Sequence, residues 1–360
     1  MKFLKLFIGA LLLAALSNIA LAEIKLIKRQ AVSLDDYDRY MGLVSDDGRH
    51  YLVVAKAERP DLETGVFFLQ IEGLFDGRLS RRIVLDKRLA APLFLPLGSQ
   101  HGLLATANAL AEWSAIKLNK EASKVERYGE LKSMLAVTET AKIGNKYIVA
   151  GVSKDNMPTL IKMSSDLRIE LELIVQSNKK GRVYSVFVQA GKVFAVVGFM
   201  DGSSELWKLS PELSILEKVK LSGAVVTGIP LRDGGFAVSY MSLPDLGVFV
   251  ERFNASAQSL WKNKIFTMAR TGAGTAGSLC ELPDGLCLVG GSNDRLLVAR
   301  IDANGQRVRL TEDTRSGLSV PSNPAGYLVG VKGNEIHVRG MARNPDASST
   351  LFHFVETATP

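Results

Sequence analysis

Three glycines in RTGAGTAG (270–277), namely Gly272, Gly274 and Gly277, have the spacing G-x-G-x-x-G of a dinucleotide-binding loop. Such a loop needs a strand before it and a helix after it, because the helix N-terminus holds the pyrophosphate. The residues that follow here, SLCELPDGLCLVGG, form two short apolar runs around Pro-Asp-Gly, which is typical of a β-hairpin. The spacing therefore does not predict a dinucleotide site, and no cofactor is expected.

The other residues that could do chemistry form no recognisable catalytic or metal-binding set. The four histidines, His50, His101, His337 and His353, have no cysteine or acidic cluster beside them in metal-ligand spacing. No serine stands in the G-x-S-x-G motif, and the carboxylates are scattered along the chain. We interpret the first two histidines as residues beside turns and the last two as packing or surface residues of outer strands. The sequence predicts no catalytic residue and no metal site.

Residues 1–22 have the pattern of a secretory signal peptide. Lys2 and Lys5 precede an apolar run at 6–15, and Ala-Leu-Ala at 20–22 is a small-x-small cleavage pattern. A membrane anchor is the alternative interpretation, but two polar residues interrupt the apolar stretch, which is short for a bilayer span. We expect cleavage before Glu23 and a periplasmic or secreted protein without a transmembrane anchor.

The charge of the mature chain, 23–360, restricts its partners only weakly. Loss of Lys2 and Lys5 with the signal peptide lowers the formal charge from +7 to +5. A mildly basic chain suits an anionic partner, but the Lys/Arg blocks of a nucleic-acid-binding arm are missing. No nucleic acid is expected.

Cys280 and Cys287 are the only two cysteines, and they flank the segment Leu282–Gly285. A two-residue turn would place them directly opposite each other, whereas a turn with a bulge at Gly285 would put them on opposite faces. Two cysteines this close in an exported protein predict a disulfide, which only the first register permits. Two buried thiols are the alternative.

One pattern, a turn followed by a short apolar strand, recurs along the whole mature chain. Its seven copies are DDGRHYLVVA (46–55), GSQHGLLATA (98–107), KIGNKYIVAG (142–151), QAGKVFAVVG (189–198), LRDGGFAVSY (231–240), LPDGLCLVGG (282–291) and NPAGYLVGVK (323–332). Counted from equivalent positions of the copies, the steps average 46 residues and the final step is 41; these positions are Tyr51, Gly102, Tyr147, Phe194, Phe236, Leu286 and Tyr327. A fixed period of this length indicates a repeat architecture.

Each copy is followed by two further strand-like runs with a polar turn between them, as in VFVERFNASAQSLWKNKIF (248–266). With a strand before each turn, every unit has four antiparallel strands. Seven such units predict an all-β fold, a seven-bladed β-propeller that forms a single domain over 23–360. We expect a monomer.

The segments DGGFAV (233–238) and VFVERFNASAQSLW (248–261) resemble the repeat of bacterial exported β-propeller proteins, DGG-ϕ-ϕ-ϕ-G followed by ϕ-ϕ-ϕ-D-x-x-G-x-x-x-W, with Trp261 at its end. The resemblance extends over all seven units but is degenerate in most of them. It implies a fold and an extracytoplasmic location, and no single activity.

The propeller explains the glycines at 272–277 and raises the question of ring closure. Innermost strands crowd around the axis, where glycine allows close approach of the backbone, so RTGAGTAG is expected to be the innermost strand of the sixth blade. An unpaired edge strand invites aggregation. We expect EIKLIKRQAV (23–32) to close the ring by pairing beside STLFHFVE (349–356) in the seventh blade.

Loops that join the second and third strands of each blade are expected to share one face with the loops between blades. Candidate binding residues on this face are Asp61, Glu112, Asp155, Met157, Met200, Asp201, Met241, Asp245, Asp294 and Glu335. Every loop of this set carries an acid, and the methionines add adaptable apolar contacts.

One basic residue is expected near the start of each innermost strand. The seven are Arg39, Arg88, Lys132, Arg182, Lys220, Arg270 and Arg315. Together they could form a basic funnel at the mouth of the channel that attracts an acidic group. Ordinary solvated strand ends, partly paired with the acids, are the alternative.

The sequence therefore favours a non-catalytic binding protein whose partner is another protein. Rigid blades that display variable loops suit protein recognition. An inhibitor or immunity protein against a toxin that acts in the periplasm would have these properties, and so would a scaffold for envelope assembly. The alternative is a receptor or hydrolase-like enzyme for an anionic small molecule or sugar in the central channel.

Overall fold

The computed structural model describes the backbone of residues 24–32, 39–46, 49–56, 65–72, 78–84, 89–97, 100–107, 112–118, 125–175, 178–242, 244–267, 274–275, 278–292, 295–312, 328–343 and 349–357. Side chains are described for 113–115 and for most of the described residues from 130 onward. These residues contain strands and turns and no helix.

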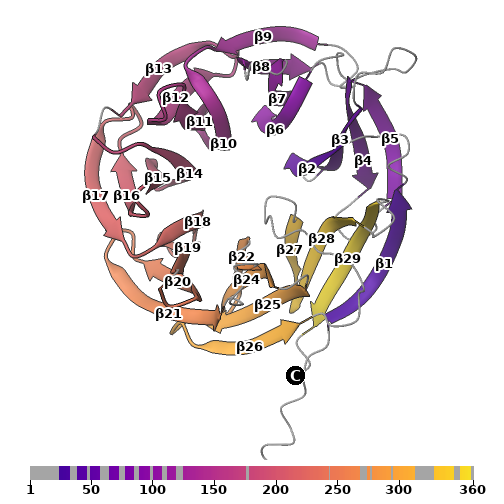
Figure 1. The fold of residues 1–360 in the computed structure, drawn as a ribbon, viewed down its shortest axis with the longest axis vertical. Helices are drawn as coiled ribbons and strands as arrows, with labels where there is room; N and C mark the ends of the chain where they lie inside the picture. Colours follow the sequence, from indigo (N-terminus) through magenta and orange to yellow (C-terminus); the bar gives the residue numbers. More distant parts are fainter. Residues whose placement is uncertain are drawn as a thin grey trace, which may run out of the picture.

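Seven antiparallel sheets surround a central axis in the described part of the chain (Figure 1). The first three consist of β2 (Arg39–Asp46), β3 (Arg49–Lys56), β4 (Gly65–Glu72) and β5 (Arg78–Val84); β6 (Leu89–Leu97), β7 (Gln100–Ala107), β8 (Glu112–Leu118) and β9 (Val125–Leu131); and β10 (Met134–Ile143), β11 (Lys146–Ser153), β12 (Pro158–Ser164) and β13 (Ile169–Ile174).

The next two sheets have the same order of strands from the axis outward. They consist of β14 (Gly181–Gln189), β15 (Lys192–Phe199), β16 (Ser204–Leu209) and β17 (Ile215–Leu221); and β18 (Ala224–Pro230), β19 (Phe236–Ser242), β20 (Gly247–Phe253) and β21 (Ser259–Thr267). The predicted all-β propeller of four-stranded antiparallel blades is confirmed by this arrangement, and the sheets are called blades one to seven below.

Blade six has a divided innermost strand. Both β22 (Gly274–Thr275) and β23 (Leu279–Leu282) pair with β24 (Gly285–Ser292), which is followed by β25 (Arg295–Asp302) and β26 (Arg307–Glu312). Gly274 lies opposite Ser292, so the described part of the G-x-G-x-x-G segment is an innermost strand, as expected, and residues 278–292 contain no helix.

Blade seven is closed by the two ends of the described chain. Its strands are β27 (Leu328–Lys332), β28 (Glu335–Arg343), β29 (Ser349–Thr357) and, outermost, β1 (Ile24–Val32). Ile24 pairs with Glu356 and Val32 with Ser349, which confirms the expected closure by the N-terminal strand. The outer strand of blade seven therefore comes from the opposite end of the sequence.

The strand assignment within blade seven was wrong by one strand. Leu328–Lys332 is the innermost strand, not the second one, and the second strand begins at Glu335. The equivalent of Leu286 is Ile336, so the last step of the repeat is 50 residues and not 41. The reason is that YLVGV has the apolar run typical of a second strand, whereas the true second strand, EIHVRGMAR, is rich in polar residues.

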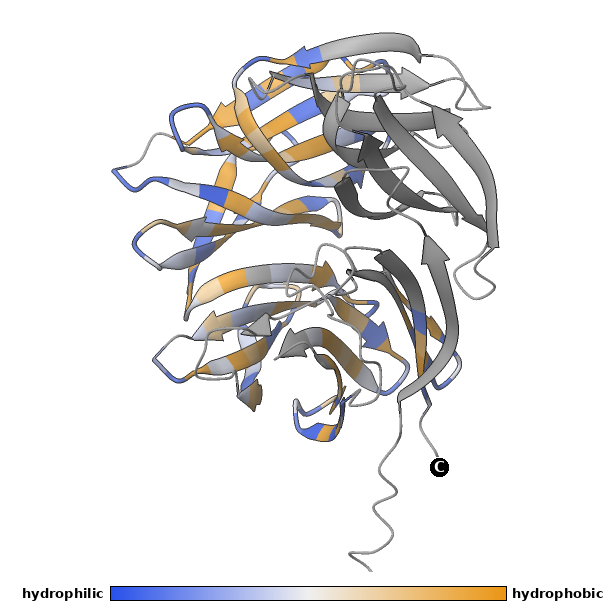
Figure 2. Ribbon diagram, turned by 45° about the vertical axis from the view of Figure 1, so that its right-hand side comes forward, coloured by the Kyte–Doolittle hydropathy of each residue, from blue (hydrophilic) through white to orange (hydrophobic). Residues whose placement is uncertain are grey.

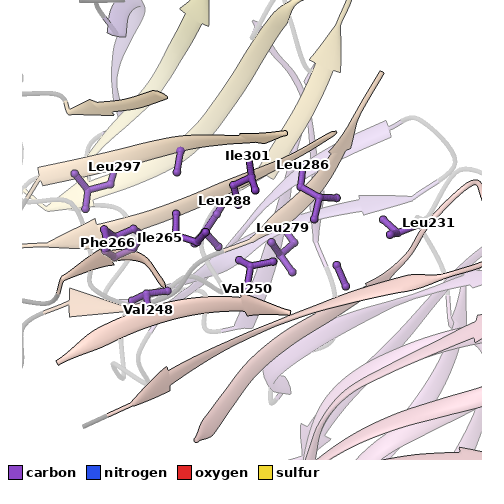
Figure 3. Packing of buried hydrophobic residues seen from close by; sticks show 12 residues of the cluster. Leu231, Val248, Val250, Ile265, Phe266, Leu279, Leu286, Leu288, Leu297 and Ile301 are labelled. Atoms are coloured by element: carbon purple, nitrogen blue, oxygen red, sulfur yellow. The ribbon is translucent and has the colours of Figure 1, made fainter. Parts of the chain in front are cut away.

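The hydrophobic core lies between neighbouring blades (Figure 2). Second strands are covered on both faces, so β15 is buried at six of its eight positions, and its sequence KVFAVVGF is almost continuously apolar. The outermost strand β17, ILEKVKL, has one exposed face and carries charges there. Figure 3 shows the layer between blades five and six, where Val250 of β20 lies next to Leu279 and Leu288 of blade six.

Candidate functional site

Two kinds of loop share one face of the ring, as the sequence predicts. The amide of Lys154, in the loop between β11 and β12, donates to the carbonyl of Ser133 between blades two and three (2.9 Å). Likewise Gly181 N donates to Asn156 O and Met200 N donates to Lys180 O, both at 2.9 Å. We call this side, made of the second-to-third-strand loops and the connections between blades, the loop face.

Most of the described acidic candidates lie on the loop face. Asp155, Asp201 and Asp245 are exposed there, and Glu112 is the first residue of β8 on the same side. Glu335 is a correction, because it follows the turn between β27 and β28 and therefore lies on the opposite face. Its misplacement follows from the strand error in blade seven. Asp61 and Asp294 lie outside the described residues.

The three methionines have different surroundings. Met200 is 72% exposed, whereas Met157 is only 7% exposed and belongs to the core. Met241 is half-buried and packs against the layer between blades five and six. Only Met200 can therefore offer an apolar side chain to a partner. Their positions differ, because Met200 directly follows β15, Met157 directly precedes β12 and Met241 lies within β19.

The basic candidates are placed less uniformly than predicted. Arg39 and Arg182 are the first and second residues of innermost strands, and Lys132 lies in the turn before β10. Lys220 is a correction, because it belongs to the outermost strand β17, although it lies near the loop face opposite Glu205. Arg88, Arg270 and Arg315 lie outside the described residues.

A basic and partly apolar surface connects blades three and four on the loop face. Lys154, Lys179, Lys180 and Arg182 are exposed within it, together with the carboxylates of Asp155 and Asp201. Gly181 is hydrogen-bonded to Asn156, and Met200 is hydrogen-bonded to Lys180. The segments 154–156, 179–182 and 199–201 therefore lie side by side on the loop face. We call these segments together with Tyr184 the basic strip.

One of the two carboxylates of the basic strip is already paired. Lys179 Nζ lies 2.8 Å from Asp201 Oδ2, and the backbone amide of Ser203 donates to Asp201 Oδ1 (2.9 Å). Hydrogen bonds from Lys179 and Ser203 lower the pKa of Asp201 below its usual range. This pair orders the loop between β15 and β16 that presents Met200, and it leaves the strip with an excess of positive charge.

Arg182 lies over an aromatic ring. Its Cζ is 4.3 Å from the ring centre of Tyr184, and Nη2 donates to the Tyr184 hydroxyl (3.1 Å). Gly198 permits this arrangement, because a Cβ there would lie 3.0 Å or less from the Tyr184 ring. These two contacts orient the guanidinium and leave it further N–H donors for other acceptors.

The described part of the channel wall contains a carboxyl group that the sequence did not single out. Glu139, in the innermost strand β10, accepts a hydrogen bond from the backbone amide of Val186 in β14 (2.8 Å). Burial raises the pKa of Glu139 to about 7, against an ordinary value of 4.5. The group links two innermost strands where β14 has a register shift, between Val183 and Ser185.

Two polar clusters of blade seven were also missed. His337 Nδ1 and His353 Nε2 are 3.0 Å apart and buried, and His337 Nε2 contacts Glu335 Oε2 (3.1 Å). These histidines belong to the second and third strands, not to outer strands, but they are packing residues as predicted. Among the described residues, no group of three or more His, Cys, Asp or Glu side chains could hold a metal ion.

The second cluster joins blade seven to blade six. The buried carboxylate of Glu356 contacts Arg300 Nη2 at 2.7 Å and Arg309 Nη1 at 3.6 Å. No sequence motif marks this cluster, because Glu356 lies far from both arginines in the chain and meets them only where blades six and seven pack together.

The two cysteines form a disulfide, as predicted. Cys280 and Cys287 lie directly opposite each other in β23 and β24, with a Cα–Cα distance of 5.0 Å. Leu282 pairs with Gly285 across a two-residue turn, so the register is the one that permits the bond. The disulfide joins β23, the second part of the divided innermost strand of blade six, to β24.

The described residues include no helix long and apolar enough to span a membrane. Searches with the sequence found no matching family model and no matching curated protein.

Solved structures share the fold at low sequence identity. A WD40 domain of coronin from Toxoplasma gondii has 12% identity and a TM-score of 0.55, covering 94% of this chain and 89% of that one. A chain in a crystal structure of the Mitotic Checkpoint Complex has 11% identity and a TM-score of 0.58, covering 92% and 95%. These similarities show that the chain has the fold of a β-propeller.

Proposed function

We propose that this protein is a non-catalytic binding module that recognises another protein through its loop face. The observation that carries the proposal is the basic strip, where Lys154, Lys180 and Arg182 make no ion pair with the described residues and the neighbouring Met200 is 72% exposed. Exposed apolar side chains beside arginine and aromatic residues are typical of the centre of a protein interface.

Two further observations support the proposal. A propeller holds its loops on rigid blades, which limits the entropy lost when a partner binds. One of the solved propellers with a similar fold belongs to an assembly, the Mitotic Checkpoint Complex. A propeller with this fold can therefore bind another protein without changing its own fold.

The location and the kind of partner are proposed from the sequence. The secretory pattern of residues 1–22 supports a periplasmic or secreted location, and the repeat resembles that of bacterial exported propellers. In that setting an inhibitor or immunity protein against a toxin acting in the periplasm, or a scaffold for envelope assembly, would use a rigid loop face in this way.

Affinity capture with the mature chain tests the proposal. The bait is 23–360, exposed to the envelope and secreted fractions of the source organism, and the bound species are quantified by mass spectrometry. A loop-face variant combines Lys154→Glu, Lys180→Glu and Met200→Ser. Its matched control combines Arg168→Glu, Lys192→Glu and Val308→Ser, which make the same changes at exposed residues away from the loop face.

We expect one near-stoichiometric protein, retained by the wild type and the control and lost with the loop-face variant. Retention by the loop-face variant would contradict the proposed face. Capture of no protein would contradict the proposed function and would favour a small ligand in the channel.

A further inference from the structure

The guanidinium of Arg182, in the basic strip, is oriented by its contacts with Tyr184. Arg182 stacks on Tyr184 and donates to the Tyr184 hydroxyl through Nη2, so its remaining N–H groups are available to an acceptor. A planar guanidinium held in this way recognises carboxylates by two parallel hydrogen bonds. The acceptor that fits best is the side chain of Asp or Glu.

The surroundings of Arg182 select for negative charge. Four cations, Lys154, Lys179, Lys180 and Arg182, lie in the basic strip with two carboxylates, and Asp201 is paired with Lys179. An approaching acidic segment is therefore attracted by the cations that remain, and its association becomes faster at low salt.

The strip also offers an apolar contact next to its cations. The amide of Met200 is hydrogen-bonded to the carbonyl of Lys180, which stands two residues before Arg182 in the chain. The exposed Met200 therefore lies beside the segment that carries Lys180 and Arg182. A flexible thioether adapts to apolar partners of different shape. Simple polyanions would not use this contact, whereas a protein segment that carries an apolar side chain between its acids would.

We propose that the basic strip is the recognition site for an acidic protein segment with an apolar anchor residue, in which Arg182 binds a carboxylate and Met200 packs on the anchor. This inference rests on the proposed function, since it names the part of the loop face and the chemistry of the partner. It makes blades three and four the centre of the interface.

The probe is a display library of random peptides, selected on the mature chain and then tested as synthetic peptides by fluorescence anisotropy. The test variant is Lys180→Glu with Arg182→Glu. The matched control is Arg168→Glu with Lys192→Glu, which makes the same change of charge at exposed residues of the opposite face. Circular dichroism and melting temperature establish that both variants fold.

We expect the selected peptides to combine acidic residues with an aliphatic or aromatic residue. Their affinity should fall at least about 30-fold in the test variant and less than about threefold in the control. Replacing the apolar residue of a selected peptide by serine should weaken binding to the wild type by about tenfold, and Met200→Ser should remove most of that difference.

Three results would overturn the inference: selected peptides without acidic residues, equal losses in the test and control variants, or equal binding of polyglutamate and the selected peptides. Failure to select any peptide would also overturn it. In each of these cases the proposed function is judged separately, because capture of a whole protein by the loop face does not depend on the peptide selection.

Discussion

The indole of Trp261 in blade five donates a hydrogen bond to the backbone carbonyl of Ala303 in blade six, over 3.0 Å. The same ring covers Gly305, whose φ of +83° places it in the left-handed region. The tryptophan at the end of one repeat therefore packs on the glycine in the turn of the next repeat. The D-x-x-G-x-x-x-W pattern has its glycine and tryptophan in one repeat, so this contact joins the tryptophan position of blade five to the glycine position of blade six.

Gly305→Ala is expected to lower the free energy of unfolding by about 2–3 kcal/mol, because the new Cβ would be strained and would collide with the Trp261 ring. Gly202→Ala is the matched control, since Gly202 has a φ of +81° and nothing within 4 Å of the added Cβ. In a Trp261→Ala background, the cost of Gly305→Ala should fall but stay above that of the control, because the new Cβ would still lie 2.7 Å from Asn263 Nδ2. Chemical denaturation measures all four variants, and an unchanged cost in that background would contradict the packing account.

Reduction of the disulfide should destabilise the protein moderately. Cys280 and Cys287 are seven residues apart, and a loop this small contributes roughly 2–3 kcal/mol in the chain-entropy account. We expect the double variant Cys280→Ser, Cys287→Ser to melt a few degrees below the oxidised wild type and close to the reduced wild type. Identical melting of the oxidised and reduced wild type would contradict the prediction.

Much of the fold could be predicted because each repeat carries a local signal. Second strands such as KYIVAGVS are covered by blades on both faces, so they are apolar throughout, and the turns before them are polar. The signal failed where this pattern was absent. In blade seven the second strand contains His337 and Arg339, and the apolar run before it was assigned in its place.

The candidate site was predicted less well, because side-chain exposure depends on neighbours in other blades. Met157 and Met200 both belong to loops between second and third strands, yet Met157 directly precedes β12 and is buried, whereas Met200 directly follows β15 and is exposed. The stacking of Arg182 on Tyr184 depends on Gly198 in the adjacent strand, and sequence spacing does not reveal this contact.

Glu356→Gln should destabilise the protein strongly, because it removes the buried carboxylate that pairs with the partly buried Arg300 and Arg309. We expect a loss of about 3–5 kcal/mol in the free energy of unfolding. The control is Glu217→Gln, which removes a half-exposed partner of Lys208 and should cost at most about 1 kcal/mol. Equal and small effects of the two substitutions would show that the Glu356 cluster does not stabilise the contact between blades six and seven.

Glu139 should make stability depend on pH. Its pKa is about 7 in the folded protein and near the ordinary 4.5 when unfolded, so the unfolded chain releases its proton first as the pH rises. The contribution of Glu139 to the free energy of unfolding is therefore fully present below pH 4.5 and is lost progressively up to about pH 7. The loss amounts to roughly 3–4 kcal/mol, because the two pKa values differ by about 2.5 and one pKa unit corresponds to about 1.4 kcal/mol.

Glu139→Gln removes this titration while it keeps an acceptor for the Val186 amide. Relative to the wild type, the variant should gain stability between pH 4.5 and pH 7 and show no further relative gain above it. Denaturation curves at several pH values measure the difference. A constant difference across this range would contradict a raised pKa for Glu139.

The most direct test of the central claim, that the loop face binds a protein, is photocrosslinking in the producing cells. A benzophenone amino acid replaces Met200 on the loop face in one strain and Val308 on an outermost strand in another, both being exposed apolar positions. We predict one discrete adduct from position 200, absent from position 308 and lost when Lys180→Glu and Arg182→Glu are added. No adduct at position 200, or the same adduct at both positions, would contradict the claim.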